Sequence, residues 1–392
     1  MTLPALDTSE IKDILFSLLR VNTANPPGNE AALALHIRDF LLSRGAKADA
    51  FRFLEHGNGR GSLAFRIKGK NPAVSIAFAG HLDTVPAGNP ADWSADPFEP
   101  REREGFVYGR GTADMKGGIA AMLALCVSWL RKGPPPVDIL CFFTADEESA
   151  GTGIKALCDA GLLENLSFLI VAEPTGLRPA ICEKGLAWYD VRVKGKTSHA
   201  AMPGKGANAI ELGYAYLERV KRRVVSASPR SPLLGKNTFS VTQAQGGVKI
   251  NVIPDQAVFA LDIRLLPGPA LDWEGVETLF REEAGRFTAA HPGFSVTVER
   301  RDCREALKTD PRHPAVKWFL RSPCAGKPIG VYYFTDASLV IPRYPALPFI
   351  IFGPGDPAEC HCPDEKIPLA SVEEAAAQYY CFVDQLRPEW FS

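Results

Sequence analysis

The sequence predicts an α/β fold that carries a second, smaller α+β domain as an insertion. Its 392 residues exceed the roughly 250–300 at which a single hydrophobic core stops growing. Near-continuous apolar runs alternate with helical stretches in the first 180 residues and again toward the end of the chain. This alternation is typical of a sheet that helices cover on both faces. Between these two parts, apolar and polar residues alternate one by one, which is typical of a sheet with one open face.

The first 180 residues contain helical and strand patterns in turn. Helices are indicated by an amphipathic spacing or by a long apolar run, and buried strands by short apolar runs. The expected elements are helices at 8–20 and 29–44, a strand at 74–79, a buried helix at 117–131, and strands at 137–144 and 167–172.

The middle of the chain predicts four strands and two helices in the order βαββαβ. The strands are expected at 187–194, 238–245, 256–264 and 294–300, and the helices at about 208–225 and 273–288. A helix after Pro314, a strand at 348–352 and a helix from Ser371 then return to the first pattern. We therefore expect a discontinuous larger domain, 1–180 and 303–392, with an inserted domain at 181–302.

Composition and charge exclude several classes of function. Lys and Arg number 44 and Asp and Glu 45, for a net charge of −1, so neither nucleic acid nor a membrane surface is an expected partner. The longest apolar stretch, 117–130, is shorter than the roughly 20 residues of a membrane span. The opening MTLPALDTSE has no signal-peptide pattern. Nine cysteines without a disulfide framework favour a reducing compartment, so we expect a cytoplasmic protein.

Histidine and carboxylate residues follow the predicted strands, where open α/β sheets place their sites. Five segments each supply one or more of them: His81 and Asp83, Asp114, the run Asp146-Glu147-Glu148, Glu173, and His361. Adjacent carboxylates after a buried strand need solvent or a cation. Two histidines with several carboxylates suit zinc first, with cobalt or manganese as alternatives, and more than four candidate ligands make a two-metal site plausible.

Each of these residues also has a purely structural interpretation when it is taken alone. His81 could be a satisfied core histidine, Asp114 a helix cap, and 146–148 a solvated loop. Cys360 and Cys362 imitate a zinc knuckle around His361, but on extended backbone the histidine would face away from both thiols. The joint pattern is stronger than any single member.

Taken in order along the chain, the motifs resemble those of a metallo-amidohydrolase and peptidase family. That family contains acetylornithine deacetylase, succinyl-diaminopimelate desuccinylase, aminoacylase-1 and carboxypeptidase G. The motifs are 79–86 (AGHLDTVP), 109–118 (GRGTADMKGG), 146–148 (DEE), 173–174 (EP), and 353–355 (GPG) followed by His361. The resemblance implies a zinc-peptidase-like α/β catalytic domain with an inserted ferredoxin-like α+β lid and dimerisation domain.

The resemblance also implies roles for the site residues. It assigns one metal to His81 and Glu173 and a second to Glu148 and His361, with Asp114 as the bridge. It makes Glu147 the general base and places Asp83 behind His81. A cis peptide bond is implied at Asp114–Met115.

In the inserted domain the resemblance implies that His199 stabilises the oxyanion, and that Asn251 and Arg264 bind the substrate carboxylate. Two structural alternatives stay open: an ion pair of Arg264 with Asp262, two residues away on the same strand, and a turn role for Asn251.

The expected activity is the hydrolysis of an amide bond in an N-acyl amino acid, as in acetylornithine deacetylase or succinyl-diaminopimelate desuccinylase. A hydroxide that bridges two divalent metal ions would attack the carbonyl. The alternative is a carboxypeptidase or dipeptidase of the same family. A small-molecule N-acyl amino acid or dipeptide is the expected partner, together with a second copy of the chain, in a homodimer through the inserted domain.

Overall fold

Parallel strands form the centre of the first of two structural units. The computed structural model describes residues 8–321 and 326–391. Strand β3 (Asn71–His81) lies between β6 (Val137–Thr144) and β7 (Phe168–Val171), parallel to both, and β17 (Phe349–Ile351) continues the sheet in parallel beside β7. These strands are almost wholly buried, which explains their near-continuous apolar sequences.

An antiparallel hairpin completes the other side of this sheet. It consists of β1 (Phe51–Gly57) and β2 (Arg60–Ile67), and β2 pairs antiparallel with β6. The order is β1-β2-β6-β3-β7-β17, and the first residue of β8 (Ala180–Glu183) bridges to β17. The apolar pattern did not predict the hairpin.

Helices cover the sheet, as the alternating pattern predicts. They are α1 (Thr8–Leu19), α2 (Glu30–Ser43), α3 (Gly117–Lys132), α4 (Thr152–Asp159), α7 (Pro314–Arg321), α8 (Ala337–Val340) and α9 (Leu369–Gln385). Helix α3 packs on α1 and α9 and is buried over its first 13 residues. Within the described residues, the stretch Thr112–Lys132 is long and apolar enough to cross a membrane, but it is a buried core helix of this unit.

Three short strands complete the description of the first unit. The strands β4 (Arg101–Arg103), β5 (Phe106–Tyr108) and β18 (Lys366–Pro368) form a separate three-stranded sheet. In all, this unit comprises Met1–Ile181, Thr309–Ile329 and Thr335–Ser392.

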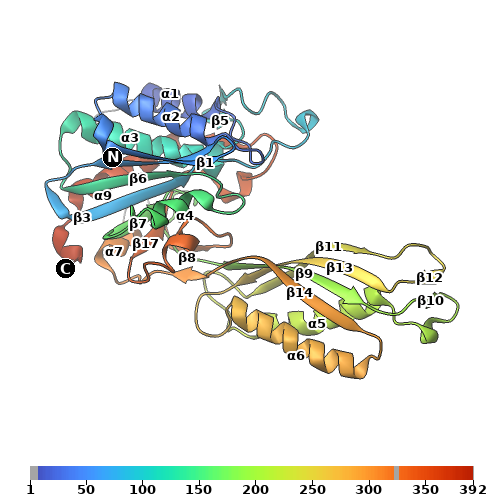
Figure 1. Cartoon of the computed structure of the whole chain (residues 1–392). Coiled ribbons are helices and arrows are strands. Elements are labelled where there is room, and N and C mark those ends of the chain that lie inside the picture. Colours follow the sequence, from blue (N-terminus) through green and yellow to red (C-terminus); the bar gives the residue numbers. More distant parts are fainter. Residues whose placement is uncertain (1–7, 322–325, 392) are drawn as a thin grey trace. The chain divides into compact units, whose positions relative to one another are not determined.

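The second unit is a four-stranded antiparallel sheet with two helices on one face (Figure 1). It comprises Cys182–Lys308 and Gly330–Phe334. Its elements are β9 (Gly185–Lys194), α5 (Ala209–Ser226), β11 (Thr238–Gly246), β13 (Gln256–Leu265), α6 (Trp273–Ala290) and β14 (Ser295–Arg304), in the sheet order β11-β13-β9-β14. The order along the chain is the predicted βαββαβ, and the predicted fold class is confirmed.

Alternation along β9 assigns the two faces of this smaller sheet. Tyr189, Val191 and Val193 belong to the buried cluster that also contains apolar residues of α5 and α6. Trp188 and the residues that alternate with this set lie on the opposite face, which no helix of the unit covers.

Helix α3 approaches the sheet so closely that it requires a glycine. A Cβ atom at Gly118 would lie 2.1 Å from the backbone oxygen of Ala172, at the end of β7. We expect Gly118→Ala to lower the free energy of unfolding by about 1–3 kcal/mol, because backbone cannot move aside as a flexible side chain can. Chemical denaturation measures this change.

The matched control is Gly285→Ala in α6, where a Cβ atom would meet nothing within 4 Å. That substitution is expected to stabilise by about 0.5–1 kcal/mol, since alanine favours a helix interior over glycine. Equal effects of the two substitutions would contradict the close-packing argument.

Candidate metal centre

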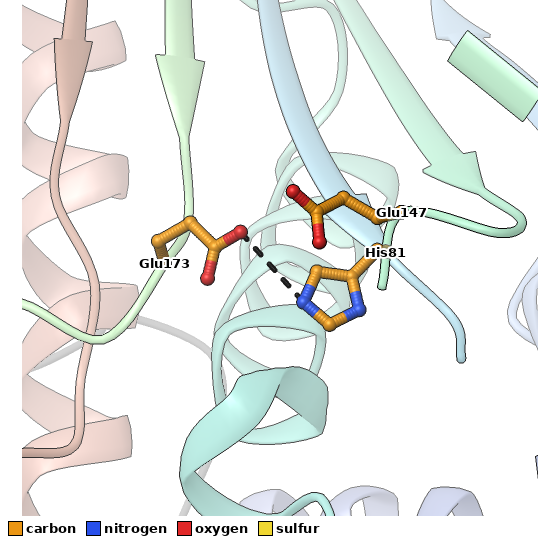
Figure 2. Close-up of side chains that lie close together, drawn as sticks. All are labelled: His81, Glu147 and Glu173. Atoms are coloured by element: carbon orange, nitrogen blue, oxygen red, sulfur yellow. Dashed lines mark ion pairs between the residues drawn. The ribbon is translucent and has the colours of Figure 1, made fainter. Parts of the chain in front are cut away.

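The carboxyl ends of three neighbouring parallel strands bring together side chains that are far apart in the sequence. His81 is the last residue of β3 and lies in register with Thr144, the last residue of β6. Glu147 follows β6, and Glu173 follows β7. Figure 2 shows the side chains of His81, Glu147 and Glu173 directed toward one another from these three elements. All three are buried.

Two overlapping groups of potential metal ligands share His81. The ligand atoms of His81, Glu147 and Glu173 lie within 4.8 Å of one another, and so do those of His81, Asp114 and Glu148. His81 Nε2 is 2.9 Å from an Asp114 oxygen and 3.7 Å from a Glu173 oxygen. The predicted ligands therefore converge from separate strand ends.

His361 completes this constellation from the loop after β17. Its Nε2 lies 3.2 Å from Asp114 Oδ2 and 3.2 Å from Glu148 Oε1. The Asp114 carboxylate thus faces His81 through one oxygen and His361 through the other. A side chain placed between two histidines in this way has the arrangement that a bridging ligand needs. The peptide bond after it, Asp114–Met115, is cis, as expected.

Burial and mutual repulsion dominate the electrostatics. Burial raises the pKa values of Glu147 and Glu173, and neighbouring carboxylates raise them further. Glu173 and Glu148 act in this way on Glu147, and Asp114 and Glu148 on Glu173. Burial opposes ionisation of Asp114, but hydrogen bonds with His361 and His81 outweigh it and lower its pKa. The same contact with Asp114, followed by that with Glu148, raises the pKa of His361 to about 10.

This donor set fits divalent metal ions. Four carboxylates meet the buried imidazole of His81, the exposed imidazole of His361 closes the cluster from the solvent side, and Glu147 Oε1 has no hydrogen-bond partner among the described residues. Buried carboxylates at such distances repel one another unless they take up protons or share a cation. Imidazole with carboxylate oxygen is a ligand combination that zinc, cobalt and manganese accept.

Asp83 connects the histidine to the carboxylate loop. The Nδ1 of His81 donates to the backbone oxygen of Asp83 at 3.0 Å, which leaves Nε2 directed at the carboxylates. The Asp83 side chain is fully buried and accepts hydrogen bonds from the backbone N–H groups of Glu147 and Glu148, each at 3.1 Å. It lies behind the histidine, where the resemblance placed it, and it also fixes the backbone of the next two site residues.

A polar network that the sequence analysis did not identify holds the same loop from outside. Asn25 donates to Asp83 Oδ2 at 2.9 Å and to Asp146 Oδ1 at 3.0 Å. Arg60, on the unpredicted strand β2, forms an ion pair with Asp146 and donates to Asn25 Oδ1 at 2.6 Å. Asp146 itself has a left-handed backbone, with φ of 67°, directly before Glu147. No motif in the sequence pointed to Arg60.

Glu365 supports the Asp114 segment and was also missed. Its buried carboxylate accepts from the backbone N–H groups of Gly111, Ala113 and Asp114 at 2.8–3.1 Å, and Arg110 pairs with it at 2.7 Å. One buried carboxylate thus satisfies three backbone donors just before the bridging position. Its distance of 251 residues from Asp114 along the chain leaves no sequence signal.

The thiols beside His361 point elsewhere. Cys360 Sγ donates to the backbone oxygen of Asp356, and Cys362 Sγ to that of Ala358, each at 3.8 Å. Burial raises the pKa of the Cys360 thiol, which disfavours the thiolate that a metal or a nucleophile would need. All eight cysteines in the described part of the chain are free.

The remaining three predicted residues lie in the second unit. His199, on β10 (Ser198–His199), pairs with Val252 of β12 (Val252–Ile253), and Asn251 is the exposed neighbour of that pair. Arg264 lies near the far end of β13 and forms the ion pair with Asp262 that was the structural alternative for it. Their roles toward a substrate stay predictions.

Buried imidazole and carboxylate ligands at the ends of parallel strands, in a chain that also carries an inserted α+β unit, define a class of α/β metallohydrolases. Within that class, residues 77–385 match peptidase family M20/M25/M40. The chain belongs to this family, and it is an enzyme of the metallopeptidase type. The predicted family is thereby confirmed.

Relatives in sequence and in structure agree with this assignment. The chain is 27% identical to a probable succinyl-diaminopimelate desuccinylase of Staphylococcus aureus, over 93% of this chain and 96% of that protein. It is 29% identical to an acetylornithine deacetylase of Myxococcus xanthus, over 96% of each. A tripeptidase from Staphylococcus aureus shares the fold with a TM-score of 0.78 and 18% identity, over 97% of this chain and 98% of that one.

The Arg60–Asn25 network predicts a measurable effect on metal binding. We expect Arg60→Met to weaken metal affinity about 10–100-fold, because Asp146 loses its charged partner directly before the Glu147–Glu148 loop. Competition with a chelator of known affinity measures this change.

Arg66→Met is the matched control. Arg66 also lies on β2 and pairs with a buried aspartate, Asp138, but that residue stands at the opposite end of β6 from the metal centre. We expect this variant to bind metal like the wild type. A similar loss of affinity in both variants would mean that the network acts only through general stability.

Proposed function

We propose that this enzyme hydrolyses the amide bond of an N-acyl amino acid with two divalent metal ions, zinc first and cobalt or manganese as alternatives. The observation that carries the proposal is the buried Glu147, which groups with His81 and Glu173 and has one oxygen without a hydrogen-bond partner among the described residues. In a metal-loaded centre, that oxygen is available to move a proton. The relatives named as desuccinylase and deacetylase support an acyl group on the substrate nitrogen.

The proposed mechanism divides the work among this chain's residues. His81 and Glu173 would hold one ion, Glu148 and His361 the other, and Asp114 both. Ions held there supply Lewis-acid polarisation of the scissile carbonyl and of the attacking water. Glu147 takes the proton from the water and delivers it to the leaving amine. Burial raises the pKa of Glu147, so its carboxyl group can hold that proton between the two steps.

The second unit would recognise the substrate in this proposal. His199 would donate to the oxyanion, and Asn251 and Arg264 would bind the carboxylate of the amino acid. Arg264 suits that task because Nη1 of its guanidinium group has no hydrogen-bond partner among the described residues and can donate to a carboxylate.

The second candidate is a carboxypeptidase or dipeptidase. The similarity of the fold to a tripeptidase favours it, and the chemistry at the amide would be the same. The higher sequence identity of the deacylase-named relatives is the reason that we place it second.

We further propose a cytoplasmic homodimer that associates through the inserted domain. Strand β11 lies at the edge of its sheet, and Val248 and Ile250 beyond it are 91% and 99% exposed. An edge strand beside exposed apolar side chains is a typical surface for pairing with a second copy.

Glu147→Gln tests the assignment of the general base. We expect it to keep the full metal content and to lower kcat by about 10²–10⁴-fold, because glutamine cannot carry the proton. Elemental analysis with steady-state kinetics measures both. The neighbouring Glu148→Gln is the comparison, and it should lose metal. Because Glu147 also groups with His81 and Glu173, loss of metal in Glu147→Gln would make it a ligand and refute the base role.

A substrate panel tests the reaction itself. We expect hydrolysis of N-acetyl or N-succinyl amino acids, loss of activity on chelation, and recovery with Zn²⁺ or Co²⁺, at about two ions per chain. Cleavage of dipeptides alone would replace the deacylase with the peptidase. Activity that survives complete removal of metal would overturn the mechanism.

A further inference from the structure

Three cationic side chains, two of them buried, surround two aromatic residues in the second unit. Lys184 and Arg304 are 3% and 4% exposed, and Arg264 is half-buried. The guanidinium carbons of Arg264 and Arg304 lie 5.9 and 5.5 Å from the ring centre of the same residue, Phe334, and Lys184 Nζ lies 5.2 Å from that of Tyr332. We refer to Lys184, Arg264, Arg304 and Phe334 as the basic cluster.

Strand register places the two arginines in one row across the sheet. Arg264 on β13 and Arg304 on β14 both pair with Leu186 of β9, which lies between them. Residues in register on neighbouring strands point to the same face. The next row contains Asp262, Trp188 and Asp302, in the same register. Both rows therefore lie on the face that α5 and α6 do not cover.

Arg264 has most of its hydrogen-bonding capacity in use. Its Nε and Nη2 atoms donate to the two oxygens of Asp262 at 2.8 and 2.9 Å, and Trp188 Nε1 donates to the same carboxylate at 2.9 Å. Only Nη1 of Arg264 lacks a partner among the described residues. The edge of this guanidinium that binds a carboxylate with two parallel bonds is therefore occupied inside the protein.

Arg304 has the opposite arrangement. Its contacts are made by Nη1, which pairs with Asp302 and donates to the backbone oxygen of Cys303 at 3.0 Å. Nε and Nη2 are buried, and neither finds a hydrogen-bond partner in the part of the chain that the structure describes. These two atoms form the edge that binds a carboxylate with two parallel bonds. Buried N–H groups are nearly always paired, so this edge requires a partner that the described residues do not supply.

Lys184 adds positive charge to the basic cluster, and it forms no ion pair with a carboxylate among the described residues. Its Nζ donates to the backbone oxygen of Lys236 at 2.6 Å. Burial lowers its pKa first, and the charge of Arg264 lowers it further, as expected for cations that lie close together. Within the described residues, the carboxylates that form ion pairs with these three cations are those of Asp262 and Asp302.

We infer that the basic cluster binds a carboxylate through the Nε–Nη2 edge of Arg304, with Nη1 of Arg264 as a further donor. Arg304, rather than Arg264, is then the two-bond anchor of the second unit. This inference rests on the proposed function, in which Asn251 and Arg264 bind the carboxylate of the amino acid itself. The carboxylate at Arg304 is then a second one, in a dicarboxylic acyl group or an acidic side chain of the substrate.

Direct binding of dicarboxylates tests the inference without any turnover. Succinate and glutarate are titrated into the metal-loaded enzyme by calorimetry, with acetate and monomethyl succinate for comparison. We expect the dicarboxylates to bind best, and Arg304→Gln to weaken their binding about tenfold or more, because two charge-assisted hydrogen bonds are lost. Arg304→Lys should recover only part of the affinity, since it keeps the charge and loses the planar edge.

Arg301→Gln is the matched control. Arg301 lies on the same strand, but its Nε and Nη2 atoms are both paired with Asp190, at 2.8 and 2.7 Å. We expect this variant to bind succinate like the wild type. Unchanged affinity in Arg304→Gln would overturn the inference and assign the carboxylate to the metal ions. Binding of inorganic phosphate in preference to any carboxylate would overturn it too.

Kinetics separate a binding role from a structural one and from failure of the proposed function. On an N-succinyl amino acid, Arg304→Gln should raise KM with little change in kcat, and on an N-acetyl amino acid it should change KM less. A uniform fall in kcat on both, with a lower melting temperature, would show that Arg304 only stabilises the fold. If the enzyme binds succinate through Arg304 but cleaves no N-acyl amino acid, the proposed deacylase activity is refuted, whereas carboxylate binding by the basic cluster is supported.

Discussion

Mutual repulsion among buried carboxylates is the constraint on which the first unit depends. Asp114, Glu147, Glu148 and Glu173 approach one another within a few ångströms, in a space that excludes most solvent. The parallel sheet creates this crowding, because the carboxyl ends of β3, β6 and β7 end at one edge. In water such charges would separate. Here the strands hold them together, and the arrangement is stable in its charged form only with cations between them.

The residues behind these carboxylates follow from the same constraint. Asp83 and Glu365 are themselves buried acids, yet they do not face the proposed metal positions. They accept backbone N–H groups from the segments that carry Glu147, Glu148 and Asp114, which fixes those segments without competing for a metal. Carboxylates therefore serve in two layers, the inner one facing imidazoles and the outer one facing amides.

The sequence predicted the inner layer and missed most of the outer one for a physical reason. Proposed ligands such as His81 and Glu173 stand at the end of an apolar strand or directly after one, so their position along the chain indicates their position in the fold. Asp83 was found only because it lies two residues from His81. Arg60 and Glu365 act from a hairpin and a loop whose contacts span 86 and 251 residues, and local patterns carry no trace of such pairings.

The two units are under different constraints, and this bears on where substrate preference resides. In the first unit, any change of ligand alters the charge balance of a buried cluster, so the positions around His81 and Asp114 leave little freedom. In the second unit, two of the charged pairs on the uncovered face of the sheet join residues two apart on one strand, Asp262 with Arg264 and Asp302 with Arg304. Within each pair the two charges neutralise each other locally, yet the two arginines are bonded differently. Arg264 uses Nε and Nη2 on Asp262, whereas those atoms of Arg304 have no partner among the described residues. In the proposed enzyme, the strand ends of the first unit would carry out the chemistry, and the unpaired guanidinium edge of the second unit would select the acid.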